Sequence, residues 1–349
     1  MIMSTTTTHG RTHGTIAKRS LSDAERDRLH GAYQHVNFPH GPRGDHDKFV
    51  AVALRWFLRF APLWLIEEII RWHSDRSGPG VLVIDNLGVE ATLPPTPIDG
   101  RRSPDKVTSL SEMVLVAVGT MLGQVFSFTH ERNGDLVTDL TPVQGKESAL
   151  TNEGAAGLGW HTEHAATGLL LGPTVNIVDY LAFLGLRPDH ARISKTVVAD
   201  IRDALPLLGR ETIDALRAPI YRLRPPLLVR QKLPVERQSI DRVPVLTGPE
   251  MCPEVRVALY GDMTEGMTPE ADRALVDLSV ALDAVQRGLA TVSGRLALVD
   301  NRTVLHGRAP FTPRFDGNDR WLMRAMVTSS LRPMQAWQRD STRVLTPMP

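Results

Sequence analysis

The second half of this sequence consists of short β-type runs separated by loops rich in Gly, Pro and Asp, without a regular alternation of strands and helices. A doubly wound parallel sheet needs that alternation, so the pattern argues against it. The pattern is typical of an antiparallel sandwich or barrel with helices packed outside it, which makes the chain mainly β with flanking helices. We expect strands at residues 80–87, 125–129, 136–140, 175–181, 196–199, 227–233, 255–260, 296–299, 303–306 and 321–327.

The helical segments are recognised by apolar residues that recur with a period near 3.6. Pro62 and Pro206 each interrupt one of these segments, and Thr268 is a good N-cap for the last of them. We expect helices at residues 46–75, 109–123, 200–217 and 269–291.

The domain organisation follows from the order of these segments. Residues 1–20 are polar, rich in Thr and without the apolar core of a signal peptide, so we expect a disordered tail there. One domain should cover residues 21–349, with helices at about 46–123 supporting a β core at about 124–331. A subunit contact is the alternative role for those helices, and the sequence leaves the oligomeric state open.

Charge and cysteine content restrict the partners. The chain has 40 Lys and Arg against 39 Asp and Glu, and a nucleic-acid binder would need a basic excess. The most apolar stretch, Phe49 to Trp72, contains charged residues and a proline, so we expect no membrane span. The single cysteine, Cys252, excludes an intrachain disulfide and fits a reducing compartment, so we expect a cytoplasmic protein with a small-molecule partner.

A histidine with an acid two positions later occurs at His73 and at His161. His73 ends a helical stretch, where residues two apart do not face each other. His161 and Glu163 instead follow a Gly-rich loop, and residues two apart on an extended segment point to the same face. The imidazole and the carboxylate can then occupy adjacent positions on one metal ion, so we predict both as metal ligands.

A third ligand is expected from a remote strand. Residues 296–308 read as a strand, a turn at Asp300-Asn301 and a second strand that ends near His306. Two histidines and one carboxylate with open positions form the facial arrangement of non-haem Fe(II) oxygenases. A zinc hydrolase could use the same set, and a hydrogen-bonded core histidine is another explanation of His306.

Two arginines follow His306, the expected third ligand. The turn signal Asp316-Gly317 predicts that residues 321–327 pair back beside the His306 strand. Arg320 and Arg324 would then share a face, about 13 Å apart. Because a guanidinium matches a carboxylate with two hydrogen bonds, this predicts two carboxylates in the pocket, although surface arginines are the simpler alternative.

Three segments resemble the clavaminate synthase-like family of Fe(II)- and 2-oxoglutarate-dependent oxygenases, which includes hydroxylases of free amino acids. They are His-Thr-Glu at 161–163, Val-Asp-Asn-Arg-Thr-Val-Leu-His-Gly-Arg at 299–308 and Pro-Arg-Phe-Asp-Gly-Asn-Asp-Arg-Trp-Leu-Met-Arg at 313–324. The resemblance extends with gaps from about Val81 to Leu331. It implies a double-stranded β-helix, which is a distorted jelly roll, flanked by helices. It also implies Fe(II), 2-oxoglutarate and O₂ as the cofactor and co-substrates.

The resemblance also implies roles for individual residues. His161, Glu163 and His306 match the catalytic iron ligands. Arg320 matches the arginine that binds the far carboxylate of 2-oxoglutarate, and Thr196 matches a hydroxyl that assists it. Because related halogenases have a small residue in place of the carboxylate ligand, Glu163 implies oxygenation, with desaturation or ring closure as alternatives.

The substrate side of the resemblance is less complete. Arg324 matches the arginine that binds the substrate carboxylate, and Thr151 lies in a loop that covers the substrate in relatives. Relatives that act on basic amino acids carry two acids where this chain has Tyr260 and Asp262, so only Asp262 remains for substrate binding. The expected reaction is hydroxylation of an amino acid or a derivative, including a neutral one such as a cyclic dipeptide, in secondary metabolism such as antibiotic biosynthesis. A non-catalytic jelly-roll binding protein is the remaining alternative.

Overall fold

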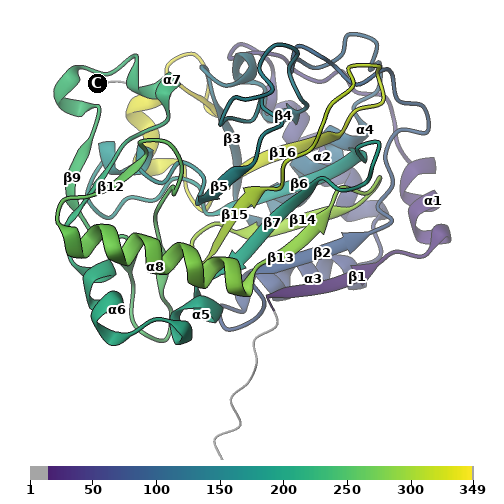
Figure 1. Ribbon diagram of the computed structural model, residues 1–349. Helices are drawn as coiled ribbons and strands as arrows, with labels where there is room; N and C mark the ends of the chain where they lie inside the picture. Colours follow the sequence, from purple (N-terminus) through teal and green to yellow (C-terminus); the bar gives the residue numbers. More distant parts are fainter. Residues whose placement is uncertain (1–14, 348–349) are drawn as a thin grey trace, which may run out of the picture.

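The structure is a computed structural model that describes residues 15–347, and two β-sheets form its centre (Figure 1). An eight-stranded sheet has the order β1-β2-β14-β6-β16-β3-β17, with β4 also paired to β16. Its strands are β1 (Ile16–Ser20), β2 (Val81–Asp85), β3 (Gln124–Phe128), β4 (Val137–Leu140), β6 (Tyr180–Arg187), β14 (Leu296–Asp300), β16 (Trp321–Thr328) and β17 (Val344–Leu345). A four-stranded sheet has the order β13-β7-β15-β5 and consists of β5 (Leu158–His161), β7 (Lys195–Asp200), β13 (Arg287–Ala290) and β15 (Val304–Arg308).

The two sheets face each other as in a jelly roll, and the alternation of side chains along the strands explains how. In β14, Ala297 and Val299 join an apolar cluster that also contains Val198 of β7 and Val304 of β15. The alternate residues of β14 join a second cluster, with the helices on the other side of the sheet. The eight-stranded sheet is therefore covered on both faces, and its inner face looks onto the four-stranded sheet.

Helices form the outer layers. The helices are α1 (Asp23–Gly31), α2 (His46–Phe60), α3 (Leu63–Ser74), α4 (Leu110–Leu122), α5 (Ile201–Ala204), α6 (Arg210–Arg217), α7 (Leu227–Arg230) and α8 (Pro269–Val285). The apolar residues of α2, α3 and α4 cover the outer face of the eight-stranded sheet, whereas α5, α6 and α8 cover the four-stranded sheet, as Figure 1 shows. Short 3₁₀ helices occur at Arg132–Gly134, Thr167–Leu170, Leu205–Leu207, Val235–Arg237 and Arg332–Trp337.

Small sheets and the helix pair α2–α3 complete the fold. Five short strands form two further sheets, which are β8 (Tyr221–Leu223), β9 (Ile240–Val243) and β12 (Thr264–Gly266) in one and β10 (Leu246–Thr247) and β11 (Glu254–Val255) in the other. Within residues 15–347, no single helix is long and apolar enough to cross a membrane, and α2 and α3 reach that length only as a pair bent by 119°.

The pairing of β16 differs from the sequence prediction. We predicted that it pairs beside the His306 strand, but β16 pairs with β6, β3 and β4 in the opposite sheet. The loop between β15 and β16 therefore crosses from one sheet to the other instead of forming a tight hairpin. Arg324 still reaches the interior, because the alternate residues of β16, Met323 and Ala325, pack against the helices.

Several predicted boundaries were wrong. Residues 16–20 were assigned to the tail, but they form β1, which pairs in parallel with β2; residues 1–14 of that tail lie outside the described part. The run 227–233 was predicted as a strand, but Pro226 precedes the short helix α7. Within α7 only Val229 is buried, whereas Leu227 and Leu228 are exposed.

The predicted helix 269–291 ends early. The helix stops at Val285, and residues 287–290 form β13, which pairs with β7. Gly288 weakens the helix there, and the pairing with β7 supplies the hydrogen bonds that a longer helix would have made. Two predicted strands were also misplaced. The run 175–181 forms a strand only from Tyr180, where β6 begins, and of the run 255–260 only Val255 lies in a strand, β11.

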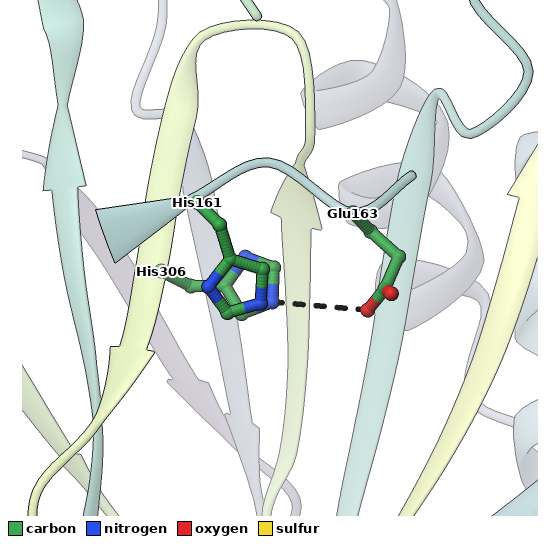
Figure 2. A group of neighbouring side chains, drawn as sticks. All are labelled: His161, Glu163 and His306. Carbon is green, nitrogen blue, oxygen red and sulfur yellow. Dashed lines mark ion pairs between the residues drawn. The ribbon is translucent and has the colours of Figure 1, made fainter. Parts of the chain in front are cut away.

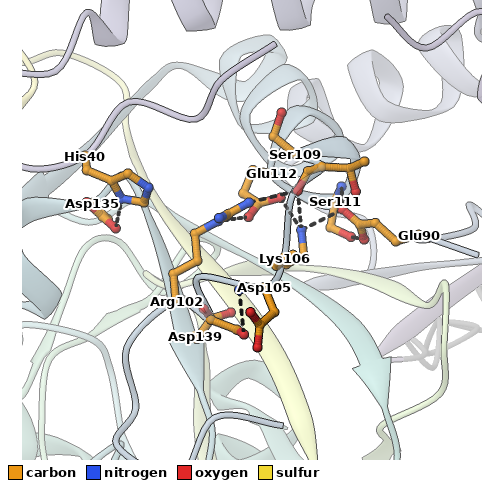
Figure 3. A network of polar contacts seen from close by, with 12 residues as sticks. His40, Glu90, Arg102, Asp105, Lys106, Ser109, Ser111, Glu112, Asp135 and Asp139 are labelled. Carbon is orange, nitrogen blue, oxygen red and sulfur yellow. Dashed lines mark hydrogen bonds and ion pairs between the residues drawn. The ribbon is translucent and has the colours of Figure 1, made fainter. Parts of the chain in front are cut away.

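A buried charge network fixes residues 93–106, a Pro-rich loop, against the start of α4 (Figure 3). The Lys106 ammonium lies 2.6 Å from a carboxylate oxygen of Glu90 and 2.6 Å from one of Glu112, and Arg102 also pairs with Glu112. Burial alone would raise the pKa of Glu90, but the Lys106 ammonium outweighs burial and holds that pKa below its ordinary value. Glu90 and Lys106 are therefore charged, and the acids and cations of the network pair with one another.

The same loop also contacts the segment that leads into Arg320. Thr96 donates a hydrogen bond to the backbone carbonyl of Asp319 at 2.8 Å, and it accepts one from Arg187 at 2.6 Å. The carboxylate of Asp319 accepts from the backbone N–H groups of Arg314 and Phe315. These contacts fix the chain immediately before Arg320.

Removing the central cation of this network should destabilise the protein. In Lys106→Met, Glu90 loses its ion-pair partner and stays buried, so we expect the free energy of unfolding to fall by about 3–5 kcal/mol. Denaturant-induced unfolding measures the change. Lys18→Met is the matched control, because Lys18 pairs with Asp85 at the surface and such pairs contribute about 0–1 kcal/mol. Equal effects of the two substitutions would contradict this prediction.

Candidate active site

Two histidines are placed side by side by the pairing of β5 with β15. His161 and His306 are directly opposite each other in this antiparallel pair, so their side chains leave the same face of the sheet. Their ring centroids are 4.1 Å apart (Figure 2). Both rings are buried, and the face that carries them looks onto the eight-stranded sheet.

Glu163 follows two residues after His161 and is held by the side chain of Asn301. The backbone N–H of Glu163 donates to Oδ1 of Asn301 at 2.8 Å, and Nδ2 of Asn301 donates to the backbone carbonyls of Glu163 (3.2 Å) and Val178 (2.9 Å). Asn301 is 1% exposed. The turn between β14 and β15 therefore fixes the loop that carries the carboxylate, although the sequence marked Asn301 only as a turn residue.

The three predicted metal ligands come together. His161, Glu163 and His306 each offer one ligand atom, and these atoms lie within 4.8 Å of one another. Nε2 of His306 is 3.9 Å from a carboxylate oxygen of Glu163, the contact drawn in Figure 2. Two metal–ligand bonds of about 2.1 Å can span this distance.

The protonation of the two imidazoles suits metal binding. Burial lowers the pKa of His161, and burial together with the neighbouring His161 and Arg324 lowers the pKa of His306, so both rings are neutral. Nδ1–H of His161 donates a hydrogen bond to the carbonyl of Gly159 at 2.9 Å. The Nε2 lone pair of His161 is therefore free for a metal ion, and the residues present fit one.

Arg320 is a buried cation that lacks an acidic partner. It is 4% exposed, its Nε donates to the Thr291 hydroxyl at 3.2 Å, and its guanidinium lies over the ring of Phe311. Within residues 15–347, no carboxylate forms an ion pair with it. Burial, with a smaller contribution from Arg308, lowers the pKa of Arg320 to about 10, so it stays charged at neutral pH.

This cation faces the histidine–carboxylate cluster. Arg320 and Thr196 line the same small cavity, of about 40 Å³, as His161, Glu163 and His306. A buried charge without a partner is strongly unfavourable, so this site favours an anion. A dicarboxylate that reaches from the cluster to Arg320 fits the donors that are present.

Arg324 is balanced by two acids. One guanidinium nitrogen pairs with Glu163 and the other lies 2.7 Å from Glu131. Glu131 also faces Nε2 of His164 at 2.8 Å, and His164 in turn contacts Thr167. Burial alone would lower the pKa of Arg324, but Glu163 and Glu131 raise it. No motif or spacing in the sequence pointed to Glu131, which follows the predicted strand 125–129 in a short loop.

A larger cavity of about 440 Å³ adjoins the cluster, since His161 and Glu163 line it as well. The predicted substrate residues Thr151 and Asp262 lie in its wall. The Asp262 carboxylate accepts two hydrogen bonds from Arg230, at 2.6 and 2.9 Å, and the Thr151 hydroxyl accepts from a neighbouring backbone N–H. Their contact with a substrate stays a prediction.

Comparison with known proteins agrees with this geometry. The family model described as "Taurine catabolism dioxygenase TauD, TfdA family" matches residues 78–326. The chain is 36% identical to L-asparagine oxygenase of Streptomyces coelicolor over 290 residues, which cover 82% of this chain and 83% of that protein. It is 30% identical to clavaminate synthase 2 of Streptomyces clavuligerus, over 83% of this chain and 86% of that protein.

Solved structures show the same fold. The crystal structure of asparagine oxygenase with Fe(II), 2S,3S-3-hydroxyasparagine and succinate has a TM-score of 0.81 and 32% identity, over 94% of this chain and 99% of that one. The non-haem iron oxygenase OrfP with Fe and alpha-ketoglutaric acid has a TM-score of 0.77 and 26% identity, over 94% and 100%. The fold is thus the predicted jelly roll, and the chain belongs to the TauD/TfdA family of Fe(II)- and 2-oxoglutarate-dependent oxygenases.

Proposed function

We propose that this enzyme hydroxylates an unactivated C–H bond of a free amino acid, or of a small molecule derived from one. The observation that carries this proposal is the buried, unpaired Arg320 in the same cavity as the histidine–carboxylate cluster. A zinc hydrolase would use the cluster but leave that cation without a partner. The similarity to asparagine oxygenase and to enduracididine beta-hydroxylase of Streptomyces hygroscopicus (31% identical, over 80% of this chain and 86% of that protein) supports an amino-acid substrate.

We propose His161, Glu163 and His306 as the ligands of Fe(II). When bound, this ion supplies with 2-oxoglutarate and O₂ the oxidising power that no side chain has. Arg320 binds the far carboxylate of 2-oxoglutarate, and its fork with the Thr196 hydroxyl nearby fixes the orientation of that molecule.

Arg324 and Glu131 are suited to a zwitterion. They present opposite charges side by side near the histidine–carboxylate cluster, and their ion pair is largely buried. A free amino acid carries a carboxylate and an ammonium group, which can pair with Arg324 and Glu131 without leaving either charge unpaired. Such double anchoring determines which carbon lies next to the metal, and an error of about 1 Å in placement can cost about a hundredfold in rate.

The wider role of the enzyme is inferred from its relatives, and its location and partners from its composition. The similarity to clavaminate synthase 2 supports a role in secondary metabolism, such as antibiotic biosynthesis. The cytoplasmic location and the absence of a nucleic-acid partner stay predictions from composition.

The first test is whether the protein binds and consumes 2-oxoglutarate. Without oxygen, protein mixed with Fe(II) and 2-oxoglutarate should develop the weak visible charge-transfer band of a chelated complex, and His161→Ala should lack it. In air, a panel of free amino acids and cyclic dipeptides should stimulate succinate formation, measured together with the hydroxylated product. A colourless mixture that consumes no 2-oxoglutarate with any compound would contradict the proposed function.

Truncation of Arg320 should selectively weaken the binding of 2-oxoglutarate. Loss of one partner of a buried charge pair costs about 2–5 kcal/mol, so we expect the KM for 2-oxoglutarate in Arg320→Ala to rise at least about 30-fold. The KM of Arg320→Lys should lie between those of Arg320→Ala and the unchanged protein, since lysine keeps the charge but cannot form the two parallel hydrogen bonds of a guanidinium. Arg314→Ala, at an exposed arginine of the same loop, is the control. A KM that Arg320→Ala leaves unchanged would show that this arginine does not bind 2-oxoglutarate.

Loss of Asn301 should weaken metal binding, although its side chain is not a ligand. Asn301→Ala removes the hydrogen bonds that hold the Glu163 backbone, and loss of such supporting contacts typically costs about 10–100-fold in metal affinity. Equilibrium dialysis with Co(II) in place of Fe(II) measures this affinity without turnover. Asn318→Ala, in an exposed turn, should bind as the unchanged protein does. Unaltered Co(II) affinity in Asn301→Ala would refute the positioning role.

A further inference from the structure

The larger cavity is lined by four carboxylates, and their partners bear on which substrate side chain it accepts. They belong to Glu131, Glu153, Glu163 and Asp262. A cationic side chain, such as a guanidinium or an ammonium, would need one of them as its partner, because a buried cation without an acid is strongly unfavourable. This question rests on the proposed function, since it concerns the substrate of the same site.

The inner acids are already engaged. Glu163 and Glu131 both pair with Arg324, and Glu131 also pairs with His164. Glu163 is also a proposed metal ligand. A substrate's side chain therefore finds no unpaired acid at this end of the cavity.

Glu153, in the loop before β5, is also paired. Its carboxylate oxygens lie 3.2 Å from the guanidinium of Arg132 and 2.5 Å from the ammonium of Lys146. Two cations thus share this one acid. A third cation at Glu153 would be repelled by both.

Asp262 is the acid that sequence reasoning assigned to the substrate, and Arg230 covers it. The two side chains form a bidentate pair with N–O distances of 2.6 and 2.9 Å. The Arg230 side chain is only 15% exposed, whereas that of Asp262 is 60% exposed. A cationic substrate that displaced Arg230 would leave a largely buried guanidinium without its acid.

The remaining wall is uncharged. Leu150, Leu227 and Leu228 line the cavity and are each about half exposed. Both ring nitrogens of His130 are buried without a hydrogen-bond partner, and burial lowers the pKa of His130 to about 4, so this ring is neutral. Further uncharged polar groups come from Thr138, Thr151, Asn152 and Tyr260, so beyond the paired acids the cavity offers apolar surface and uncharged donors and acceptors.

We propose that the substrate's side chain is uncharged, and that Arg230 is a specificity-determining residue that excludes cationic side chains by occupying Asp262. The apolar wall formed by α7 accepts aliphatic groups. An amide satisfies the neutral imidazole of His130, which can both donate and accept.

Releasing Asp262 tests this inference. Wild-type protein should form succinate with asparagine or leucine in preference to arginine or lysine, compared as kcat/KM. In Arg230→Gln, the freed carboxylate should shift that ratio toward arginine and lysine by at least about tenfold, since a hydrogen bond to a charged group contributes about 1.5–3 kcal/mol. Calorimetric titration of the same amino acids without oxygen should show the same shift in binding.

Two further variants control for general damage. Arg230→Lys keeps a cation beside Asp262 and should keep the wild-type preference. Arg222→Gln removes a comparable bidentate pair, with Asp241, from a position outside the cavity lining, and should change neither rate nor preference.

The outcomes separate the two proposals. Turnover that favours arginine or lysine in the wild type, or a ratio that Arg230→Gln leaves unchanged, would overturn this inference while the proposed function stands. Absence of succinate with every amino acid and every cyclic dipeptide would overturn the proposed function and this inference with it.

Discussion

The register between β5 and β15 is the constraint on which the site depends. It places His161 opposite His306, on the face that looks into the space between the two sheets. A shift of one residue would turn one imidazole toward the helices outside, because side chains along a strand alternate between faces. The turn that joins β14 to β15 reinforces the register, since Asn301 ties the Glu163 loop to the same strands.

The opposite sheet supplies the two arginines that face the histidine–carboxylate cluster. β16 contributes Arg324 from within the strand, and Arg320 directly precedes the strand. Helices cover the outer face of this sheet, so both guanidinium groups lie between the sheets and away from bulk water. The jelly roll thus brings two segments that are remote in sequence next to His161. One is β15, which carries His306, and the other is β16 with the residue before it, which carries Arg324 and Arg320.

The sequence predicted the parts of the site that depend on residue type at fixed local spacing. His161 and Glu163 are two residues apart on an extended segment, and the strand–turn–strand pattern around His306 was confirmed. Contacts made by a single distant side chain left no periodic signal, which is why Asn301 and Glu131 were missed. The pairing partner of β16 was predicted wrongly because a turn signal shows where a chain reverses, but not which sheet it enters.

Segments with weak local preference were also misjudged. The apolar run 227–233 is equally compatible with a strand and a helix. Only the folded chain shows that residues 227–230 are helical and that Val229 is their buried residue. Residues 287–290 continue a helical pattern in sequence, yet pairing with β7 prevails over it. In both segments tertiary contacts decided the structure, and α7 bears on function because it forms the wall over the cavity.

The balance of charge in the site distinguishes the roles of its two arginines. Arg324 already has Glu131 and Glu163, whereas no carboxylate in the described part of the chain pairs with Arg320. Fe(II) and dianionic 2-oxoglutarate bring equal and opposite charges, so their binding leaves the net charge of the site unchanged. A zwitterionic amino acid would also add no net charge, and Arg324 and Glu131 offer one partner to each of its charged groups. A cationic side chain would add one unmatched charge to a closed, largely buried set, and Arg230 on Asp262 removes the acid that could have matched it.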